Sequence, residues 1–177
     1  MSFEHLQDNI NASETKEGKY PLLLSVVEDF VSSDDHPISK LSNIVAAIHE
    51  TLRPLWTGFY VVIEDELQLF PFQGPLACTR IKHGKGVCGQ SWAQDKVLVV
   101  PDVELFPGHI ACSSRSRSEI VLPVHSLKGE VVAVLDIDSE EVGTFDEVDA
   151  KYLTMVCDAL STCLGLVCKR YDPIGRP

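Results

Sequence analysis

Cys112 stands in a short polar segment, PGHIACSSRSRSEIVLP (residues 107–123), which opens on Pro-Gly and closes on an apolar run. Glu119 lies seven residues further on, at the start of that run. Cysteine is a strong nucleophile once it is deprotonated, and loops held by a rigid scaffold often carry reactive groups. A carboxyl group on the adjoining strand can supply a proton. The segment is therefore a candidate for thiol-based catalysis.

The runs EIVLPVH and EVVAVLDID, joined by SLKG, predict an antiparallel hairpin that carries three acidic residues. A four-residue loop sets Glu119 opposite Asp136, whereas a two-residue loop sets it opposite Asp138. In either register the three carboxyl groups share one face of the sheet, and close like charges raise the pKa of at least one of them. Two interpretations are compatible with this pattern: a solvated end of the sheet, or a cluster that holds a cation or donates a proton at neutral pH.

Two other reactions of Cys112 fit the sequence less well. The phosphate-binding loop of tyrosine phosphatases has an arginine six residues after its cysteine, but here that residue is Ser118 and the arginines are Arg115 and Arg117. A cysteine hydrolase would pair Cys112 with a base such as His109, yet no third group or oxyanion motif accompanies the pair.

Two ligand sites receive weak support from the sequence. Cys78, Cys88, His109 and Cys112 are zinc-ligand types, but they form no short Cys-x-x-Cys knuckle. GKGVCG (residues 84–89) has the spacing of a dinucleotide fingerprint, but the chain lacks the βαβ unit that gives this spacing its meaning. We expect no metal, and we interpret the glycines as a tight turn into a helix.

The composition indicates one soluble domain, because 45% of the 177 residues are apolar and 23% are charged. A net charge of -11 and a pI near 4.9 disfavour nucleic acid and anionic membranes as partners. Neither a signal peptide nor a membrane-spanning apolar run is present, so we expect the chain in the cytoplasm. In that reducing compartment, cysteines serve in packing, metal binding or thiol chemistry rather than in structural disulfides.

Three of the six cysteines, Cys157, Cys163 and Cys168, lie in a predicted C-terminal helix over residues 144–170. Apolar residues recur there at helical spacing, and a Thr-x-x-Glu capping box opens the helix at Thr144. We interpret the three cysteines as packing residues, because their spacing suits neither a metal knuckle nor a redox Cys-x-x-Cys.

The elements that must position these residues follow from the hydrophobic periodicity. Besides the C-terminal helix, we expect three helices. The first covers residues 21–31 and has Pro21 at its start, the second is the apolar stripe that ends before Pro54, and the third lies within residues 83–94. Strands are expected at 55–63, 67–72, 77–81, 97–100, 119–125 and 130–138. This order predicts an α+β domain in which N- and C-terminal helices pack against a central, mainly antiparallel sheet.

Six motifs in chain order resemble one family. They are WTGFYV (56–61), PFQGPLAC (71–78), GKGVCG (84–89), PDVELFPGHIAC (101–112), SEIVLPV (118–124) and VLDIDS (134–139). The set closely resembles the free methionine-R-sulfoxide reductases, which are stand-alone GAF-domain enzymes. The resemblance implies a single GAF domain, which we expect over residues 21–170. Residues 1–20 are polar and aperiodic, so we expect them to form a flexible tail, and residues 171–177 a second tail.

The resemblance also implies the redox chemistry. Members of the family reduce free L-methionine-(R)-S-oxide with a cysteine nucleophile, which matches Cys112. The attack leaves a cysteine sulfenic acid. The resolving cysteine matches Cys78, which would form a disulfide with Cys112, and Cys88 matches a third thiol. Thioredoxin supplies the electrons, no other cofactor is needed, and members often form homodimers.

The remaining implied roles concern the pocket. Glu119, Asp136 and Asp138 would protonate the sulfoxide oxygen and pair with the substrate's ammonium group. Trp56 and Tyr60 share a strand face and would line the pocket for the S-methyl group, although two such aromatics also suit a core.

The chain departs from the family pattern after HIAC, where SRSRS adds two arginines. Arg115 and Arg117 would favour the Cys112 thiolate and attract the substrate's carboxylate. The alternative function is a GAF-type sensor that binds a small molecule without turnover.

Overall fold

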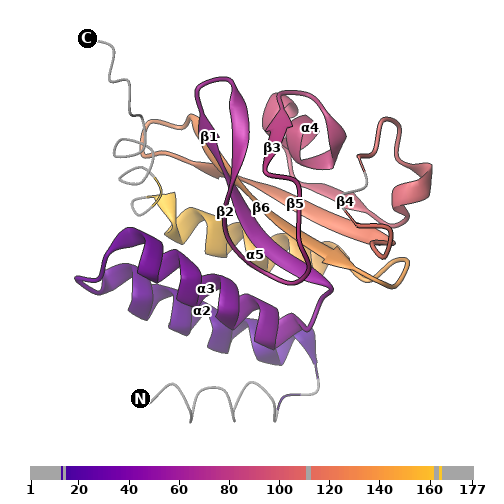
Figure 1. Ribbon diagram of the computed structural model, residues 1–177. Helices are drawn as coiled ribbons and strands as arrows, with labels where there is room; N and C mark the ends of the chain where they lie inside the picture. The colour runs from indigo at the N-terminus through magenta and orange to yellow at the C-terminus, as the bar shows by residue number, and fades with distance from the viewer. Residues whose placement is uncertain (1–12, 14, 111–112, 162–163, 165–177) are drawn as a thin grey trace.

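The computed structural model describes residues 13, 15–110, 113–161 and 164. Six strands form one antiparallel sheet in the order β3-β2-β1-β6-β5-β4 (Figure 1). The strands are β1 (Trp56–Ile63), β2 (Glu66–Gln73), β3 (Arg80–Lys82), β4 (Leu98–Val100), β5 (Ser118–His125) and β6 (Val131–Ser139). The helices are α2 (Lys16–Ser32), α3 (Pro37–Leu52), α4 (Gly86–Gln94), the 3-10 turn η1 (Val103–Leu105) and α5 (Glu147–Ala159). The predicted α+β class and antiparallel sheet are confirmed.

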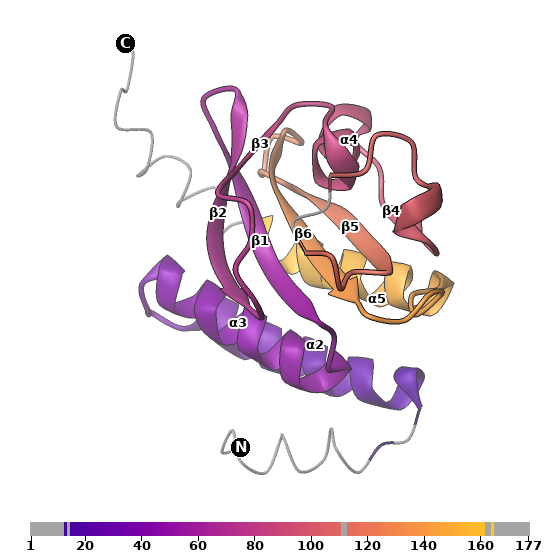
Figure 2. The same ribbon diagram turned by 45° about the vertical axis from the view of Figure 1, so that its right-hand side comes forward.

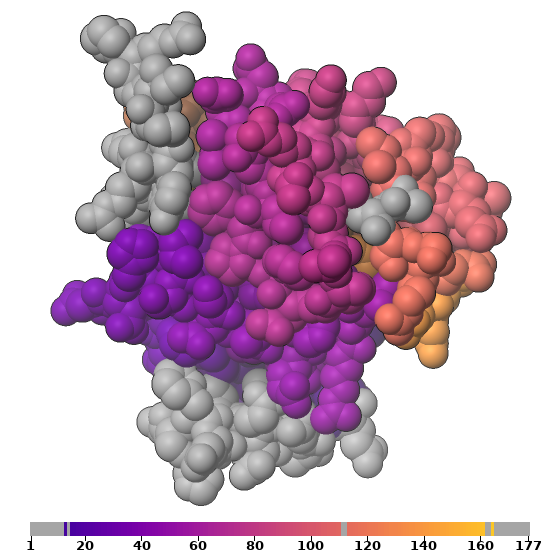
Figure 3. Space-filling view, in the orientation of Figure 1, coloured from indigo at the N-terminus to yellow at the C-terminus, as the bar shows by residue number. Residues whose placement is uncertain are grey.

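Helices cover both faces of the sheet. The apolar stripes of α2, α3 and α5 pack on one face, and α4 lies on the other (Figures 1 and 2). Strand β1 contributes to both layers, with Phe59 and Val61 facing the three long helices and Tyr60 facing α4. The segments from β2 to α4 form a continuous surface on the near face of the molecule in the space-filling view (Figure 3). The central strands are therefore buried on both sides, which explains their nearly unbroken apolar runs.

Helix α3 follows its predicted stripe. Leu41, Ile44 and Ile48 are fully buried, and the helix ends at Arg53, which has a left-handed φ of 51° directly before Pro54. A proline at the next position disfavours continued helix, so the boundary follows from local chemistry.

Helix α2 begins earlier than predicted. It starts at Lys16, and the Thr15 hydroxyl caps it by accepting a hydrogen bond from the amide of Gly18. Pro21 lies inside the helix rather than at its start, and Tyr20 just before it is fully buried. Residues 16–20 thus belong to the folded helix and not to a tail. Tertiary burial of Tyr20 outweighs the local signal that proline provides at a helix start.

Helix α5 also begins differently from the prediction. Its N-cap is Asp146, which forms a capping box with Asp149, whereas Thr144 donates its hydroxyl to Ser139 before the helix starts. Aspartate serves as well as threonine at an N-cap, so the sequence offered two candidate boxes two residues apart. The predicted packing role of Cys157 is confirmed by its burial in the core, while Cys163 and Cys168 lie outside the described residues.

The hairpin of β5 and β6 sets Glu119 opposite Asp138. The connecting loop is closed by a hydrogen bond from the amide of Ser126 to the carbonyl of Glu130, and His125 pairs with Val131 rather than with Glu130 as the longer loop would require. A bulge between Val124 and His125 then shifts the pairing, so the register is the one expected for the shorter loop. Bulges depend on strand twist and partner packing, which a loop length does not reveal.

Strand β3 begins at Arg80, later than the predicted 77–81. The carbonyl of Cys78 instead accepts a hydrogen bond from the Tyr60 hydroxyl at 3.1 Å, and Ala77 faces a pocket. The segment that carries Cys78 is therefore fixed by the neighbouring strand face before β3 starts.

A buried polar network joins α2 to α5. Asp149 is 1% exposed and accepts hydrogen bonds from the Tyr20 hydroxyl at 2.6 Å, the Lys16 ammonium at 2.5 Å and the Asp146 amide at 2.8 Å. Removing one partner from such a network leaves buried donors unsatisfied.

We expect Asp149→Ala to lower the free energy of unfolding by about 3 kcal/mol, because it removes the N3 side chain of the capping box and leaves the buried Tyr20 hydroxyl without an acceptor. Urea unfolding followed by circular dichroism measures the change. Asp158→Ala, on the exposed side of the same helix, is the control and should stay within about 0.5 kcal/mol of the parent protein. Equal losses in the two variants would contradict this account of the network.

Candidate active site

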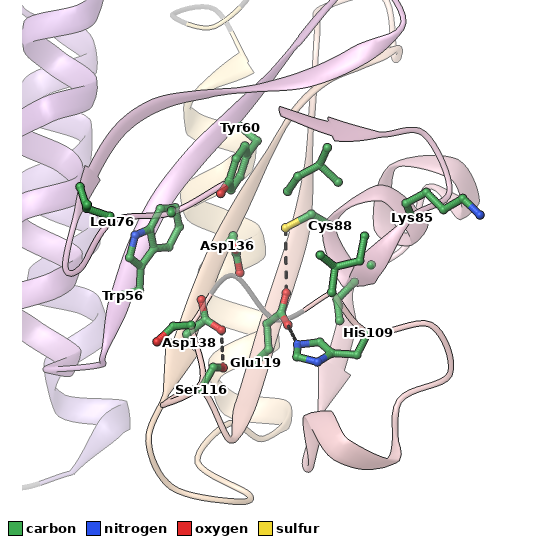
Figure 4. Close-up of a pocket in the computed structure, with 16 residues that line it drawn as sticks. Trp56, Tyr60, Leu76, Lys85, Cys88, His109, Ser116, Glu119, Asp136 and Asp138 are labelled. Carbon is green, nitrogen blue, oxygen red and sulfur yellow. Dashed lines mark hydrogen bonds and ion pairs between the residues drawn. The ribbon is translucent and has the colours of Figure 1, made fainter. Parts of the chain in front are cut away.

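A pocket lies between the sheet face under α4 and the segment that leads into β5 (Figure 4). It is lined by all the acidic and aromatic residues predicted for the site and by further residues from α4 and the loops. The side chains that carry its chemistry are Trp56, Tyr60, Cys88, His109, Ser116, Glu119, Asp136 and Asp138. The structure therefore brings together residues from β1, α4, β5 and β6.

The register of the central strands assembles the acidic cluster. Glu119 pairs with Asp138 across β5 and β6, and Asp136 pairs with Gly58 of β1. A Cβ atom at Gly58 would come within 2.4 Å of the Trp56 ring and 2.6 Å of the Phe72 Cβ. Only glycine therefore leaves room for the indole to lie flat along the strand beside the carboxyl groups.

The carboxyl groups are buried, and burial sets their protonation. Glu119 is 5% exposed and Asp136 is 6% exposed. Burial raises the pKa of both well above the usual range, and repulsion from the neighbouring carboxylates raises each further. Burial also raises the pKa of Asp138, to about 6, although a hydrogen bond from Ser116 opposes the shift. The predicted pKa-shifted cluster is thus present, and burial favours the protonated forms of Glu119 and Asp136.

One atom of the cluster lacks a partner. Within the described part of the chain, the buried Oδ1 atom of Asp136 accepts no hydrogen bond. Buried carboxyl oxygens are normally satisfied, so an unpaired one inside a pocket indicates a position for a ligand donor or cation.

The aromatic wall stands beside the cluster. The Trp56 ring stacks on Tyr60 at 5.8 Å and on Phe72 at 5.5 Å between ring centroids. Trp56 is 4% exposed and Tyr60 is 1% exposed, so both residues belong to the core and also line the pocket. Trp56 and Tyr60 therefore serve both as core residues and as pocket residues, because this part of the core forms the pocket wall.

The thiols differ in state. Cys88 is buried in the first turn of α4, and its Sγ atom lies 3.9 Å from Glu119 Oε1. Burial, with Asp136 and Glu119 nearby, raises the pKa of the Cys88 thiol well above its usual range, which makes it a poor nucleophile. Cys78 is disulfide-bonded. Cys112 lies outside the described residues, but Ile110 before it and Ser113 after it both line the pocket.

Ser116 and His109 also line the pocket, although neither was assigned to the substrate site from the sequence. Ser116 donates a hydrogen bond to Asp138 at 2.5 Å, and His109 places Nε2 3.8 Å from Glu119 Oε2. Burial lowers the pKa of His109, so its imidazole is neutral beside the protonated cluster. The motif PGHIAC marks His109 in the sequence, whereas nothing distinguishes Ser116 among the loop serines.

The predicted role of the two arginines is wrong for Arg115. Its side chain bonds to Glu140 at 2.7 Å on the exposed surface, and neither Arg115 nor Arg117 lines the pocket. The backbone of Arg117 instead donates to Ser139 and accepts from Val103. The backbone of Arg117 therefore ties this segment to β6 and η1, whereas Ser116 in the same segment faces the pocket.

The glycine motif of residues 84–89 is a turn into α4, as predicted. The amide of Gly84 donates to the carbonyl of Gly89 at 2.9 Å, and all the strand pairs of the described sheet are antiparallel. No βαβ unit that would hold a dinucleotide occurs in the described part of the chain.

Residues 39–164 match the GAF domain family. The chain is 52% identical over 147 residues to GAF domain-containing protein A of Dictyostelium discoideum, covering 82% of this chain and 92% of that protein. It is 43% identical over 129 residues to the free methionine-R-sulfoxide reductase of Escherichia coli, covering 72% and 78%. The X-ray structure of free methionine-R-sulfoxide reductase from Neisseria meningitidis in complex with its substrate matches with a TM-score of 0.84 at 44% identity, covering 90% and 95%. The chain belongs to the free methionine-R-sulfoxide reductases, a GAF-domain family.

The resemblance seen in the motifs is thus confirmed, and the fold of this reductase family member is the GAF fold. Among its described helices, none is long and apolar enough to cross a membrane.

The protonation of the cluster predicts how the stability of this reductase family member varies with pH. Asp136 and Glu119 have a higher pKa when folded than when unfolded, so the folded state binds more protons between the two values. The free energy of unfolding should therefore fall as the pH rises above about 4, the usual range of these groups. Asp136→Asn cannot ionise, so it should flatten this fall and leave the variant more stable than the parent at pH 8.

Urea unfolding at pH 4, 6 and 8 checks the prediction. The control is Asp34→Asn, whose carboxyl group is exposed in the turn after α2 and which should keep the parent's pH dependence. A pH dependence of Asp136→Asn equal to that of the parent would show that Asp136 ionises normally in the fold.

Proposed function

We propose that this protein reduces free L-methionine-(R)-S-oxide to methionine. The observation that carries the proposal is the pocket in which carboxyl groups with raised pKa values face an aromatic wall, with Ile110 and Ser113 also in its lining. The sulfoxide oxygen is a poor leaving group until it is protonated, and a cluster with raised pKa values is suited to that task.

The pocket offers a complementary partner for each end of the substrate. The ammonium group would bind the carboxylate of Asp138 and donate a hydrogen bond to the unpaired Oδ1 of Asp136, an oxygen that can accept while the group keeps its proton. The carboxylate would face the N-terminus of α4, where Gly86 and Val87 line the pocket and their amides have no helical partner. The S-methyl group would lie against Trp56 and Tyr60.

The reaction balances with these groups. The Cys112 thiolate attacks the sulfoxide sulfur while a carboxyl group of the cluster, Glu119 or Asp136, delivers a proton to the oxygen. Oxygen passes to Cys112 as a sulfenic acid, and methionine leaves with the electron pair. The Cys78 thiol then forms a disulfide with Cys112 and releases water, and the thioredoxin dithiol reduces that disulfide.

Two features support the pairing of Cys78 with Cys112. Cys78 is disulfide-bonded, while Cys88 and Cys157 are free. The hydrogen bond from Tyr60 to the Cys78 carbonyl also holds this segment beside the pocket wall. Cys88 would then act by holding Glu119 in place rather than as a nucleophile. The cytoplasm, which the composition favours, supplies the thioredoxin that the cycle requires.

Turnover with free L-methionine-(R)-S-oxide, thioredoxin, thioredoxin reductase and NADPH tests the function through NADPH loss. Cys112→Ser should release no methionine, even in a single turnover without reductant. Cys78→Ser should release one equivalent and then stop, and Cys157→Ser should behave as the parent does. Tight binding of the sulfoxide without turnover by the parent protein would instead favour the alternative of a small-molecule sensor.

Ser116→Ala should raise KM about twofold at pH 7 with little change in kcat, because losing a hydrogen bond of about 1.5 kcal/mol raises the pKa of Asp138 by about one unit from its value of about 6. The Ser116 hydrogen bond lowers the pKa of Asp138, so its loss leaves Asp138 more protonated and less attractive to the ammonium group. The defect should therefore shrink at pH 8.5. Arg115→Gln, next in the chain but paired with Glu140, should leave KM unchanged. A tenfold rise in KM for Arg115→Gln would show instead that Arg115 contributes to substrate binding.

A further inference from the structure

The floor of the pocket gathers three metal-binding side chains. One ligand atom each from Cys88, Glu119 and Asp136 lies within 4.8 Å of the other two, and all three residues are buried. They come from α4, β5 and β6, so their arrangement is held by the sheet and the helix rather than by a loop (Figure 4).

A second observation points to a ligand at the same place. Asp136 is 6% exposed, and its Oδ1 atom has no hydrogen-bond partner in the described structure. The contact from Cys88 Sγ to Glu119 Oε1 is likewise long, at 3.9 Å. The floor thus combines an unsatisfied acceptor with a weakly bonded thiol, which is costly unless a ligand completes it.

We propose that Cys88, Glu119 and Asp136 bind one divalent transition-metal ion, for which Zn²⁺ is the best fit. Tetrahedral Zn²⁺, with bonds of about 2.3 Å to sulfur and about 2.0 Å to oxygen, holds those ligands about 3.5 Å apart. The separation of 3.9 Å between Cys88 Sγ and Glu119 Oε1 needs only a small side-chain movement to reach that geometry.

The donor set selects the class of metal. A thiolate favours zinc and similar ions over Mg²⁺ and Ca²⁺, which prefer oxygen ligands. Metal binding displaces the proton of the Cys88 thiol. The negative charges of the thiolate and the two carboxylates together then exceed the positive charge of the ion. Three protein ligands leave a fourth position, which opens to the pocket and takes water.

The same floor would receive the substrate's ammonium group, so metal and substrate would compete. This part of the inference rests on the proposed function, whereas metal binding itself does not. We therefore expect Zn²⁺ to inhibit turnover competitively with the sulfoxide and to be displaced by it.

Isothermal titration of the full-length protein with Zn²⁺ tests the site. The background variant Cys78→Ser with Cys112→Ser removes the thiols that the proposed mechanism uses, and it should still bind one equivalent. Adding Cys88→Ser, or separately Asp136→Asn, should weaken binding at least tenfold, since even outer-sphere partners of a metal contribute about 10- to 100-fold in affinity. Cys157→Ser is the matched control, because its thiol is also buried and free but lies on the other side of the sheet, and it should leave the affinity unchanged.

Absorption spectroscopy and the choice of metal ion provide two further tests of the site. Co²⁺ in the same background should give a thiolate-to-metal absorption band that is lost with Cys88→Ser, whereas Mg²⁺ should not bind. Affinity that survives both Cys88→Ser and Asp136→Asn, or failure of the background variant to bind Zn²⁺, would overturn the proposed site. Zinc binding without inhibition would preserve the metal site and count against the placement of the substrate's ammonium group.

Discussion

Two buried carboxyl groups, Glu119 and Asp136, lie beside the half-buried Asp138 on one face of the sheet, and the surrounding structure must offset their mutual repulsion. Glu119, Asp136 and Asp138 would destabilise the hairpin if all were ionised, because little water reaches them. The fold accommodates them through retained protons, the Ser116 hydroxyl and the contact with Cys88. A cation or a hydrogen-bond donor that enters the site therefore stabilises the ionised carboxylates.

The rest of the structure holds this cluster in place. The three long helices cover the opposite face, so the central strands are fixed on both sides and cannot slip in register without exposing their core residues. The Asp149 network joins the first and last described helices behind the sheet. The bulge between Val124 and His125 sets the pairing that brings Glu119 opposite Asp138.

The chemistry that we propose and the metal site that we infer use the same features. A protonated carboxyl group can deliver a proton to a sulfoxide oxygen, and the same group, once ionised, is a ligand for a cation. Cys88 is better suited to binding a cation than to attacking the sulfoxide, because its buried thiol is a weak nucleophile but lies beside two carboxyl groups. The pocket is thus suited to positively charged ligands of more than one kind.

The sequence by itself determined the α+β class, the antiparallel hairpins and the shared face of the three acidic residues, because period-two and helical patterns are local properties. Its motifs also identified the family and the aromatic wall. The start of α2, the cap of α5, the register of β5 and β6, and the engagement of Arg115 with Glu140 and of Ser116 with Asp138 were decided only by the tertiary structure. In each of these cases the local sequence offered near-equivalent choices, and long-range burial or a hydrogen-bond partner from a distant segment selected one of them.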